Sequence, residues 1–299
     1  MFTSILCPID FSEPSIRALD YALALAVRER GHVTLVYVTH PFMVAAAAAY
    51  EAMTVKDDAE RELRNVAAAA VATVRGGAAQ TDIFVSIGDP ASEILKCAID
   101  RHSDCIVMGT QGLSGLKKMF FGSVTEQVLR RSPVPVLAVP PGESVAGADS
   151  IAKRIGRVMA PVDFSERSID DVRVALELAQ GWSVPLLVLH VVSGISGPAP
   201  WRETLAAHER ILLAKARTKM DTFVAPLGTG LSLETLVTMG SPADEVGAVA
   251  AEHNVGLIVM GLLGTSGLLG ARPGSVAYRV LCLATAPVLA LPSRTHAST

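Results

Sequence analysis

The chain has 299 residues, 50% of them apolar, a net charge of −3 and a mean hydropathy of +0.41. This length predicts about two domains with sizeable cores, and no apolar run reaches the ~18 residues that a membrane span needs. The lack of a basic patch or tail argues against nucleic acid as a partner. The first ten residues show no signal peptide pattern, so we expect a cytoplasmic protein without membrane contact.

Along the chain, short branched apolar runs alternate with helical patterns. In the first half the apolar runs are Ile5–Ile9, Val33–Val38, Ile83–Ile87, Cys105–Met108 and Val134–Val139. The helical patterns between them are Pro14–Arg30, Ala49–Arg75, Pro90–Arg101 and Ser123–Arg131. Continuously apolar strands that are each followed by a helix indicate an α/β fold with a parallel sheet covered on both faces. We predict a doubly wound sheet of strand order 3-2-1-4-5, with a ligand crevice between strands one and four.

The second half repeats the first. The run Cys7–Glu13 recurs 153 positions later as Ala160–Glu166, and Gly88–Glu93 recurs 152 positions later as Gly240–Glu245. A period of ~150 residues far exceeds that of solenoid repeats. The sequence therefore predicts two tandem five-stranded domains, at 1–140 and 154–293, with a proline-led linker at 141–153 and a flexible tail at 294–299.

One glycine-spaced loop follows the fourth strand in each half. The first has Gly109 and Gly112, then nine residues, then Gly122-Ser123, and the second repeats this spacing at Gly261, Gly264 and Gly274-Ser275. Glycines let a backbone approach a ligand closely, and the N–H groups that open the next helix suit a phosphate. In the predicted topology Asp10 and Asp163, which follow strand one, face these loops. This arrangement suits a nucleotide whose ribose or base contacts the carboxylate.

Simpler interpretations stay open at this stage. Asp10 and Asp163 could cap the first helix of each half, and the glycines could serve only as turns. Asp89-Pro90 and Ser241-Pro242 have the pattern of a cap followed by the first helical residue. The four cysteines form no CxxC pair and are expected to be buried and reduced, and the histidines show no metal-ligand spacing.

Other nucleotide and hydrolase motifs are absent. The turn after the first strand, Asp10-Phe11-Ser12-Glu13, is not a dinucleotide G-x-G-x-x-G loop, and no G-K-[ST] sequence occurs. No plausible Ser–His–Asp or Cys–His set is present. The segments between the loop glycines contain no Asp, Glu or His that could act as a general base, so we assign no catalytic residue.

The Pro-x-Asp after strand one, with Gly-x-x-Gly, nine residues and Gly-Ser after strand four, resembles the universal stress protein family. The resemblance covers both halves and implies a tandem, ATP-binding, stress-response protein in which ATP comes with Mg²⁺. It implies a first binding site formed by Pro8, Asp10, Val38, Met108, Gly109, Gly112, Gly122, Ser123 and Val124. The second site would comprise Pro161, Asp163, Val191, Met260, Gly261, Gly264, Gly274, Ser275 and Val276.

The two loops differ in character. The first carries Thr110, Gln111, Lys117 and Lys118, whereas the second carries Leu262, Leu263, Arg272 and Pro273. Proline removes one backbone donor from the predicted phosphate cradle. We expect ATP in both sites, with the more favourable chemistry in the first.

Three functions remain in view. The first is a nucleotide sensor or regulatory module, and the second is a slow ATPase or autophosphorylating protein with Ser123 or Thr125 as acceptor. The third is an interaction protein in which nucleotide is only structural. The last apolar strands, Val134–Val139 and Pro287–Leu291, are expected to pair the two domains as a pseudo-dimer, because an uncovered strand edge is unfavourable. A further homodimer is left open.

Overall fold

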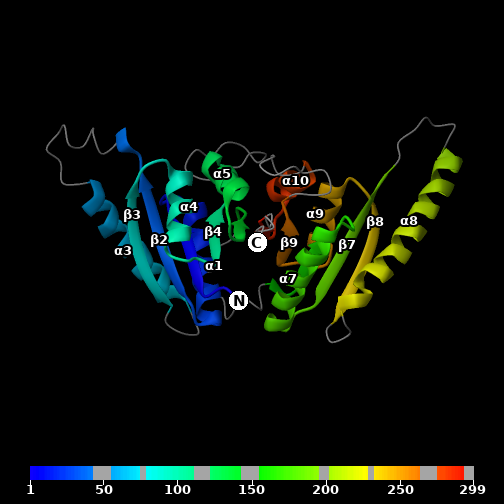
Figure 1. Ribbon diagram of the computed structural model, residues 1–299, viewed down its shortest axis with the longest axis horizontal. Coiled ribbons are helices and arrows are strands. Elements are labelled where there is room, and N and C mark those ends of the chain that lie inside the picture. Colours follow the sequence, from blue (N-terminus) through cyan, green and yellow to red (C-terminus); the bar gives the residue numbers. More distant parts are fainter. Residues whose placement is uncertain are drawn as a thin grey trace, which may run out of the picture. The chain divides into compact units, whose positions relative to one another are not determined.

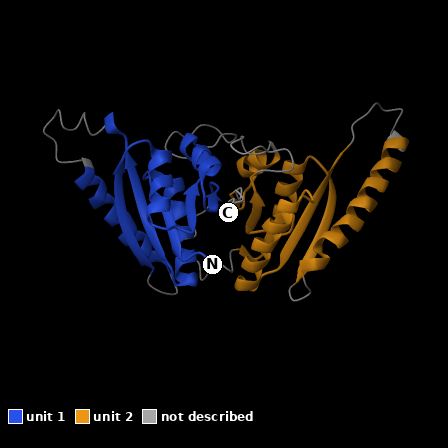
Figure 2. Ribbon diagram, viewed as in Figure 1, with its two compact units in different colours: residues 1–154, 294–299 blue, residues 155–293 orange. Residues whose placement is uncertain are grey.

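The computed structural model describes residues 1–42, 55–74, 79–110, 122–142, 155–194, 202–227, 232–262 and 275–292. The chain divides into two compact units, residues 1–154 with 294–299, and residues 155–293, which Figure 2 colours separately. The tail and the linker beyond Gly142 lie outside the described residues, so these two predictions stay untested.

Each unit contains a five-stranded parallel sheet. In the first unit the order is β3-β2-β1-β4-β5, and in the second it is β8-β7-β6-β9-β10, which is the same order by position in the repeat. The first five strands are β1 (Ser4–Pro8), β2 (His32–Thr39), β3 (Gln80–Ile87), β4 (Cys105–Gly109) and β5 (Val136–Val139). The others are β6 (Val158–Pro161), β7 (Leu186–Ser193), β8 (Leu233–Gly240), β9 (Leu257–Gly261) and β10 (Val288–Leu291). The predicted fold class and strand order are confirmed.

Helices cover both faces of each sheet (Figure 1). The first unit has α1 (Glu13–Glu29), α3 (Val55–Thr73), α4 (Pro90–Asp100) and α5 (Ser123–Arg131). The second has α7 (Glu166–Trp182), α8 (Arg202–Val224), which continues into the 3₁₀ turn Ala225–Leu227, α9 (Pro242–Glu252) and α10 (Ser275–Leu283). Helix α1 packs on β1, β2 and β4 and contacts α3, while α4 packs on β1 and β2 and contacts α5. The α1–α3 pair and the α4–α5 pair therefore cover opposite faces.

The cores form from the continuously apolar strands. Every residue of β4 is buried, and Ile5, Leu6 and Ile106 are fully enclosed. Each such aliphatic side chain contributes about 1.5–3 kcal/mol when removed from water. Cys7, Cys97 and Cys105 are free and buried, as expected, whereas Cys282 is only partly buried. Burial raises the pKa of the Cys7 and Cys105 thiols, which keeps them neutral. No helix within the described ranges is both long and apolar enough to cross a membrane.

Strand β3 begins at Gln80 rather than at the predicted Ile83. Thr81 and Asp82 pair with Val33 and Thr34 of β2, although both are polar. Because β3 is the outermost strand in the order of its unit, one side of it is not enclosed between strands and tolerates polar residues. The apolar run predicted only the last five residues of this strand, Ile83–Ile87.

The turn between α1 and β2 brings two backbones into close approach. Arg30 ends α1 in the left-handed conformation (φ 55°), and the Gly31 N–H donates to the Ala26 carbonyl at 2.8 Å. The next residue, His32, donates its N–H to the Thr3 carbonyl at 2.9 Å. A Cβ atom on Gly31 would lie 2.5 Å from that same carbonyl oxygen. Glycine is therefore required here for space rather than for its backbone angles.

We predict that Gly31→Ala lowers the free energy of unfolding by about 1–3 kcal/mol, because the backbone of Thr3 must move. Gly247→Ala, inside α9 where a Cβ meets nothing within 4 Å, is the matched control and should stabilise by up to ~1 kcal/mol. Chemical denaturation measures both. Equal effects of the two substitutions would contradict the steric argument.

Candidate functional site

A pocket of about 320 Å³ opens at the carboxyl ends of the strands in the first unit. Its lining comes from β1, β2 and β4, from the loop after β1, and from the first turns of α1, α4 and α5. The lining residues are Pro8, Ile9, Asp10, Ser15, Val36, Val38, Pro90, Ile94, Met108, Gly109, Gly122, Ser123, Val124 and Thr125. Its volume is at the lower end of the ~300–1,000 Å³ typical of small-molecule sites.

The pocket exists because β1 and β4 separate. These two strands pair only at Ile5↔Cys105 and Leu6↔Ile106, whereas β1 stays paired with β2 up to Pro8↔Val36. Beyond β1, the Ile9 N–H donates to the Val36 carbonyl at 2.8 Å, which draws the chain toward β2. The carboxyl ends of β1 and β4 thus bound a crevice at the topological switch point, where doubly wound folds bind ligands.

The turn after β1 fixes the acidic side chain at this crevice. Phe11 adopts a left-handed φ of 63°, which is unfavourable for a bulky residue and recurs at Phe164 (φ 59°) in the second unit. Asp10 Oδ1 accepts the Ser12 N–H at 3.0 Å and the Ser12 hydroxyl. Ser12 is the N-cap of α1, and its hydroxyl accepts the Ser15 N–H. The helix cap is therefore the serine, and Asp10 braces it rather than capping the helix itself.

The glycine end of the pocket is held by two hydrogen bonds. The Thr125 hydroxyl, which is buried, donates to the Gly109 carbonyl at 3.0 Å, and the Gly122 N–H donates to the Thr110 carbonyl at 3.1 Å. A Cβ atom on Gly109 would lie 2.8 Å from the Pro14 carbonyl oxygen, so only glycine fits beneath α1. Helix α5 begins at Ser123 beside this point, and the first N–H groups of a helix, which have no acceptor within the helix, suit an anion.

The structure brings most residues of the predicted first site together. Eight of the nine line the pocket, and Gly112 lies outside the described residues. Their contact with a ligand stays a prediction. Six other lining positions were not predicted as site residues: Ile9, Ser15, Val36, Pro90, Ile94 and Thr125. Val36 could have been found, since alternate residues of a strand share a face with Val38.

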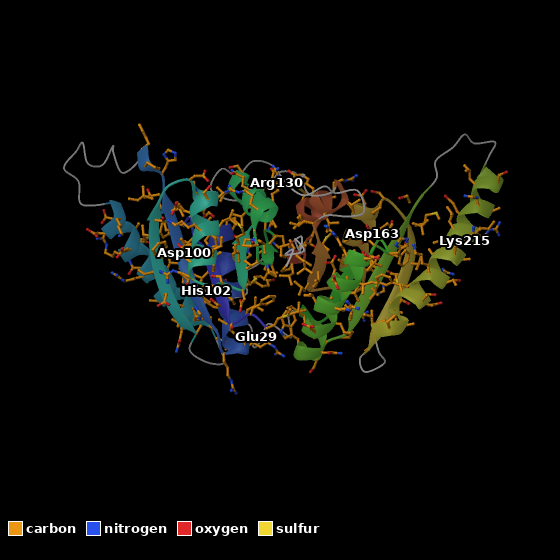
Figure 3. The ribbon with its side chains drawn as sticks, in the orientation of Figure 1. Glu29, Asp100, His102, Arg130, Asp163 and Lys215 are labelled. Carbon is orange, nitrogen blue, oxygen red and sulfur yellow. The ribbon has the colours of Figure 1, made fainter. Side chains whose placement is uncertain are left out.

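The described residues of the predicted second site lie at the corresponding edge of the second unit. Pro161, Val191, Met260 and Gly261 belong to β6, β7 and β9, and Val276 belongs to the first turn of α10. Asp163 follows β6 and is labelled in Figure 3; its Oδ1 accepts the Ser165 N–H at 3.0 Å and the Ser168 hydroxyl at 2.6 Å. Gly264, Gly274 and the side chain of Ser275 are outside the described part of the chain.

The two loops can be compared only at their first residues. Thr110 and Leu262 are both buried. The remaining loop residues that distinguished the repeats (Gln111, Lys117, Lys118, Leu263, Arg272 and Pro273) lie outside the described residues. The predicted cap at Asp89 is confirmed, since its carboxylate accepts the Ser92 N–H at 2.9 Å, whereas Ser241 occupies the cap position without a side-chain hydrogen bond.

The aromatic packing behind the turn also differs between units. Phe11 packs against Tyr37 with ring centroids 5.0 Å apart, whereas Phe164 packs against His190 at 4.0 Å. His190 Nδ1 lies 2.8 Å from the Val162 carbonyl oxygen, and burial lowers the pKa of this imidazole. A hydrogen-bonded, stacked imidazole favours a structural role. Among the described residues, no group of three or more His, Cys, Asp or Glu side chains is arranged to hold a metal ion.

One acidic side chain of the second unit lies at the candidate site without having been predicted from the sequence. Asp171, on α7, accepts the Gly261 N–H through Oδ2 at 2.8 Å. Burial of this carboxyl, reinforced by the negative charges of Asp170 and Asp163, raises its pKa to about 6 despite the hydrogen bond from Gly261. No motif marks the residue, because it is one of two consecutive aspartates on an otherwise ordinary helix.

The raised pKa makes stability depend on pH. The folded chain retains the Asp171 proton up to about pH 6, whereas the unfolded chain loses it near pH 3.8, so stability falls as pH rises through this window. We predict that the unfolding free energy of Asp171→Asn, relative to that of the original chain, increases by about 1–3 kcal/mol between pH 4 and pH 6.5. Denaturant titration across this range measures the difference, and a constant difference would contradict the prediction.

The chain is similar to several known universal stress proteins. Universal stress protein YxiE of Bacillus subtilis is 34% identical over 149 residues, which is 46% of this chain and 99% of that protein. Universal stress protein MJ0531 of Methanocaldococcus jannaschii is 31% identical over 144 residues, covering 46% of this chain and 82% of the relative. A universal stress protein structure from Archaeoglobus fulgidus shares the fold over 97% of this chain and 98% of its own, with a TM-score of 0.67 at 24% identity.

The sequence pattern of the Universal stress protein family matches this chain twice, at residues 1–140 and at residues 154–292. These two matches fall on the two compact units and together cover most of the chain. The chain therefore belongs to the universal stress protein family and carries two copies of the family's domain.

Proposed function

We propose that this chain is a nucleotide-responsive stress protein that binds ATP in the pocket of its first unit and acts as a sensor or regulatory module. The observation that carries the proposal is the convergence of eight predicted ligand residues, from four separate parts of the sequence, on one pocket. Chance would not gather the end of β1, the end of β2, the end of β4 and the start of α5 around a single cavity of ligand size.

The chemistry of the pocket divides along its length. Val36 and Val38 supply an apolar end suited to a base, and the Asp10 carboxylate can accept hydrogen bonds from ribose hydroxyls. At the other end, Gly109 permits close backbone approach, while the exposed Ser123 hydroxyl and the opening N–H groups of α5 suit phosphate oxygens. A purine nucleoside joined to a phosphate chain matches this order of groups.

A magnesium ion would be held mainly by the nucleotide. Among the described lining residues, the side-chain oxygen donors are the Asp10 carboxylate and the hydroxyls of Ser15, Ser123 and Thr125, of which Thr125 already donates to Gly109. Mg²⁺ commonly takes one or two protein oxygens together with phosphates and waters. The residues present fit that pattern, and the ion would neutralise phosphate charge.

The pocket favours binding over catalysis. Among its described lining residues Asp10 is the only carboxylate, and none is a histidine. Thr125, considered as a phosphoryl acceptor, is buried and donates its hydroxyl to Gly109, which leaves Ser123 as the accessible hydroxyl. Regulation by occupancy of the site is therefore preferred to slow hydrolysis or autophosphorylation.

The second unit supplies a second nucleotide site in this proposal, built from the matching residues at the ends of β6, β7 and β9 and the start of α10. We also propose that the last strands, β5 and β10, are the segments through which the repeats pair. Both are four-residue strands that are buried throughout. The cytoplasmic location stays a prediction.

Mass spectrometry of the natively purified protein should detect co-purifying adenine nucleotide. Val38→Phe, which fills the apolar end of the first pocket, should weaken the tighter ATP site at least tenfold, or by about 1.4 kcal/mol. Val191→Phe, the matched change in the second unit, should leave that tighter site intact. Calorimetric titration with ATP and Mg²⁺ separates the two variants, and undiminished tight binding after Val38→Phe would refute the site assignment.

Thr125→Val removes the hydroxyl that holds the Gly109 carbonyl and leaves that buried acceptor without its partner. We predict a loss of ATP affinity of about fivefold to tenfold at the first site, because one net hydrogen bond contributes ~1 kcal/mol to the geometry of the loop. The corresponding residue in the second unit is Ala277. Ala277→Thr serves as the control and should leave first-site affinity unchanged; a similar loss in both variants would argue against local positioning.

A further inference from the structure

The first helix of the second unit places a carboxylate beneath the glycine that ends β9, and the matching position of the first unit is an alanine. Asp171 of α7 corresponds to Ala18 of α1, 153 positions earlier. Ala18 is fully buried and offers no polar group, whereas the Asp171 carboxylate accepts the Gly261 N–H at 2.8 Å. A Cβ atom on Gly261 would lie 2.8 Å from Asp171 Oδ2, which shows how directly the carboxylate underlies the end of β9.

This position is the base of the second crevice. The pairing between β6 and β9 ends at Met159↔Ile258, so Gly261 lies beyond the last pair of these two strands. In the first unit the corresponding glycine, Gly109, lines the pocket, as does Ser15, which lies one helical turn before Ala18. Ala18 itself does not line the first pocket, so Asp171 bears on the second crevice through its contact with the Gly261 N–H.

Among the described residues, the charges near this carboxylate are mostly negative. The charged groups that act on it are Asp163, Asp170 and Arg167, two negative and one positive. The strands on which α7 packs contribute no charged residue from β6 or β9 and only His190 from β7, and burial lowers the pKa of that imidazole. A phosphate at this end would compete with Asp171 for the Gly261 N–H and, among the described residues, would meet more negative than positive charge.

We propose that Asp171 sets the ligand class of the second crevice, so that this crevice selects an adenosine-type ligand of low charge and discriminates against a triphosphate. The inference rests on the proposed function, because it assumes that the glycine end of each crevice receives phosphate. The two sites of one chain then differ in ligand class. Protonation of Asp171, whose pKa is about 6, weakens this discrimination in mildly acidic solution.

The test uses the full chain with the first site blocked by Val38→Phe, and titrates it separately with ATP and with adenosine at pH 8. The expected result is that adenosine binds at least as tightly as ATP. Adding Asp171→Asn, which keeps an oxygen acceptor for Gly261 and removes the charge, should raise ATP affinity about tenfold and leave adenosine affinity unchanged. Lowering the pH to 5.5 should raise ATP affinity more in the Asp171 chain than in the Asn variant, which corrects for titration of the phosphates.

The reverse change provides the matched control. Ala18→Asp, placed in a chain whose second site is blocked by Val191→Phe, should lower ATP affinity at the first site about tenfold while adenosine affinity changes little. If Ala18→Asp fails to fold by circular dichroism, the Asp171→Asn comparison decides alone. Equal changes for ATP and adenosine, no change for either, or no binding of either ligand in the Val38→Phe chain would each overturn the inference. Failure of the Val191→Phe chain to bind ATP at its first site would instead refute the proposed function.

Discussion

The separation of β1 from β4 is the constraint on which the rest of the candidate site depends. A parallel sheet that first grows outward through β2 and β3, and then restarts on the other side of β1, has crossover helices on opposite faces. At the point of reversal neither helix covers the carboxyl ends of the two central strands. The chain after β1 then turns away from β4 and toward β2, where the Ile9 N–H donates to the Val36 carbonyl. The loops that follow β1 and β4 line the space between them.

The loop after β1 adapts to this opening at a conformational cost. Phe11 and Phe164 both occupy the left-handed region, which is unfavourable for a side chain of this size. The cost is offset locally, since the aspartate before each phenylalanine accepts the backbone N–H of the capping serine, and that serine starts the next helix. The aspartate, the strained residue and the helix cap therefore form one unit, which explains why the run Asp-Phe-Ser-Glu is identical in both repeats.

Much of this architecture could be predicted from the sequence because it depends on the spacing of apolar runs and glycines along the chain. The continuous apolar runs specified a parallel sheet, and the repeated glycine spacing located the edge at which Pro8, Asp10, Met108 and Gly122 converge. The carboxyl end of β3 was predicted correctly, but its polar first residues were not, because an outermost strand need not be apolar along its whole length. Asp171 could not be predicted, because its importance comes from a contact with Gly261 that is 90 residues distant and belongs to no local pattern.

The duplicated fold allows the two crevices to diverge without altering the scaffold. The central glycine is held in both units, but by different groups: the Thr125 hydroxyl reaches the Gly109 carbonyl from α5, while the Asp171 carboxylate reaches the Gly261 N–H from α7. Either contact orders the strand end, but in the second unit the carboxylate occupies the glycine N–H, which in our proposal discourages an anionic ligand there. In our proposal the two crevices differ in their affinity for ATP, and because a ligand stabilises a folded unit by RT ln(1 + [L]/Kd), they respond over different concentration ranges. A single chain with such sites can distinguish changes in ligand class that two identical sites would report as one signal.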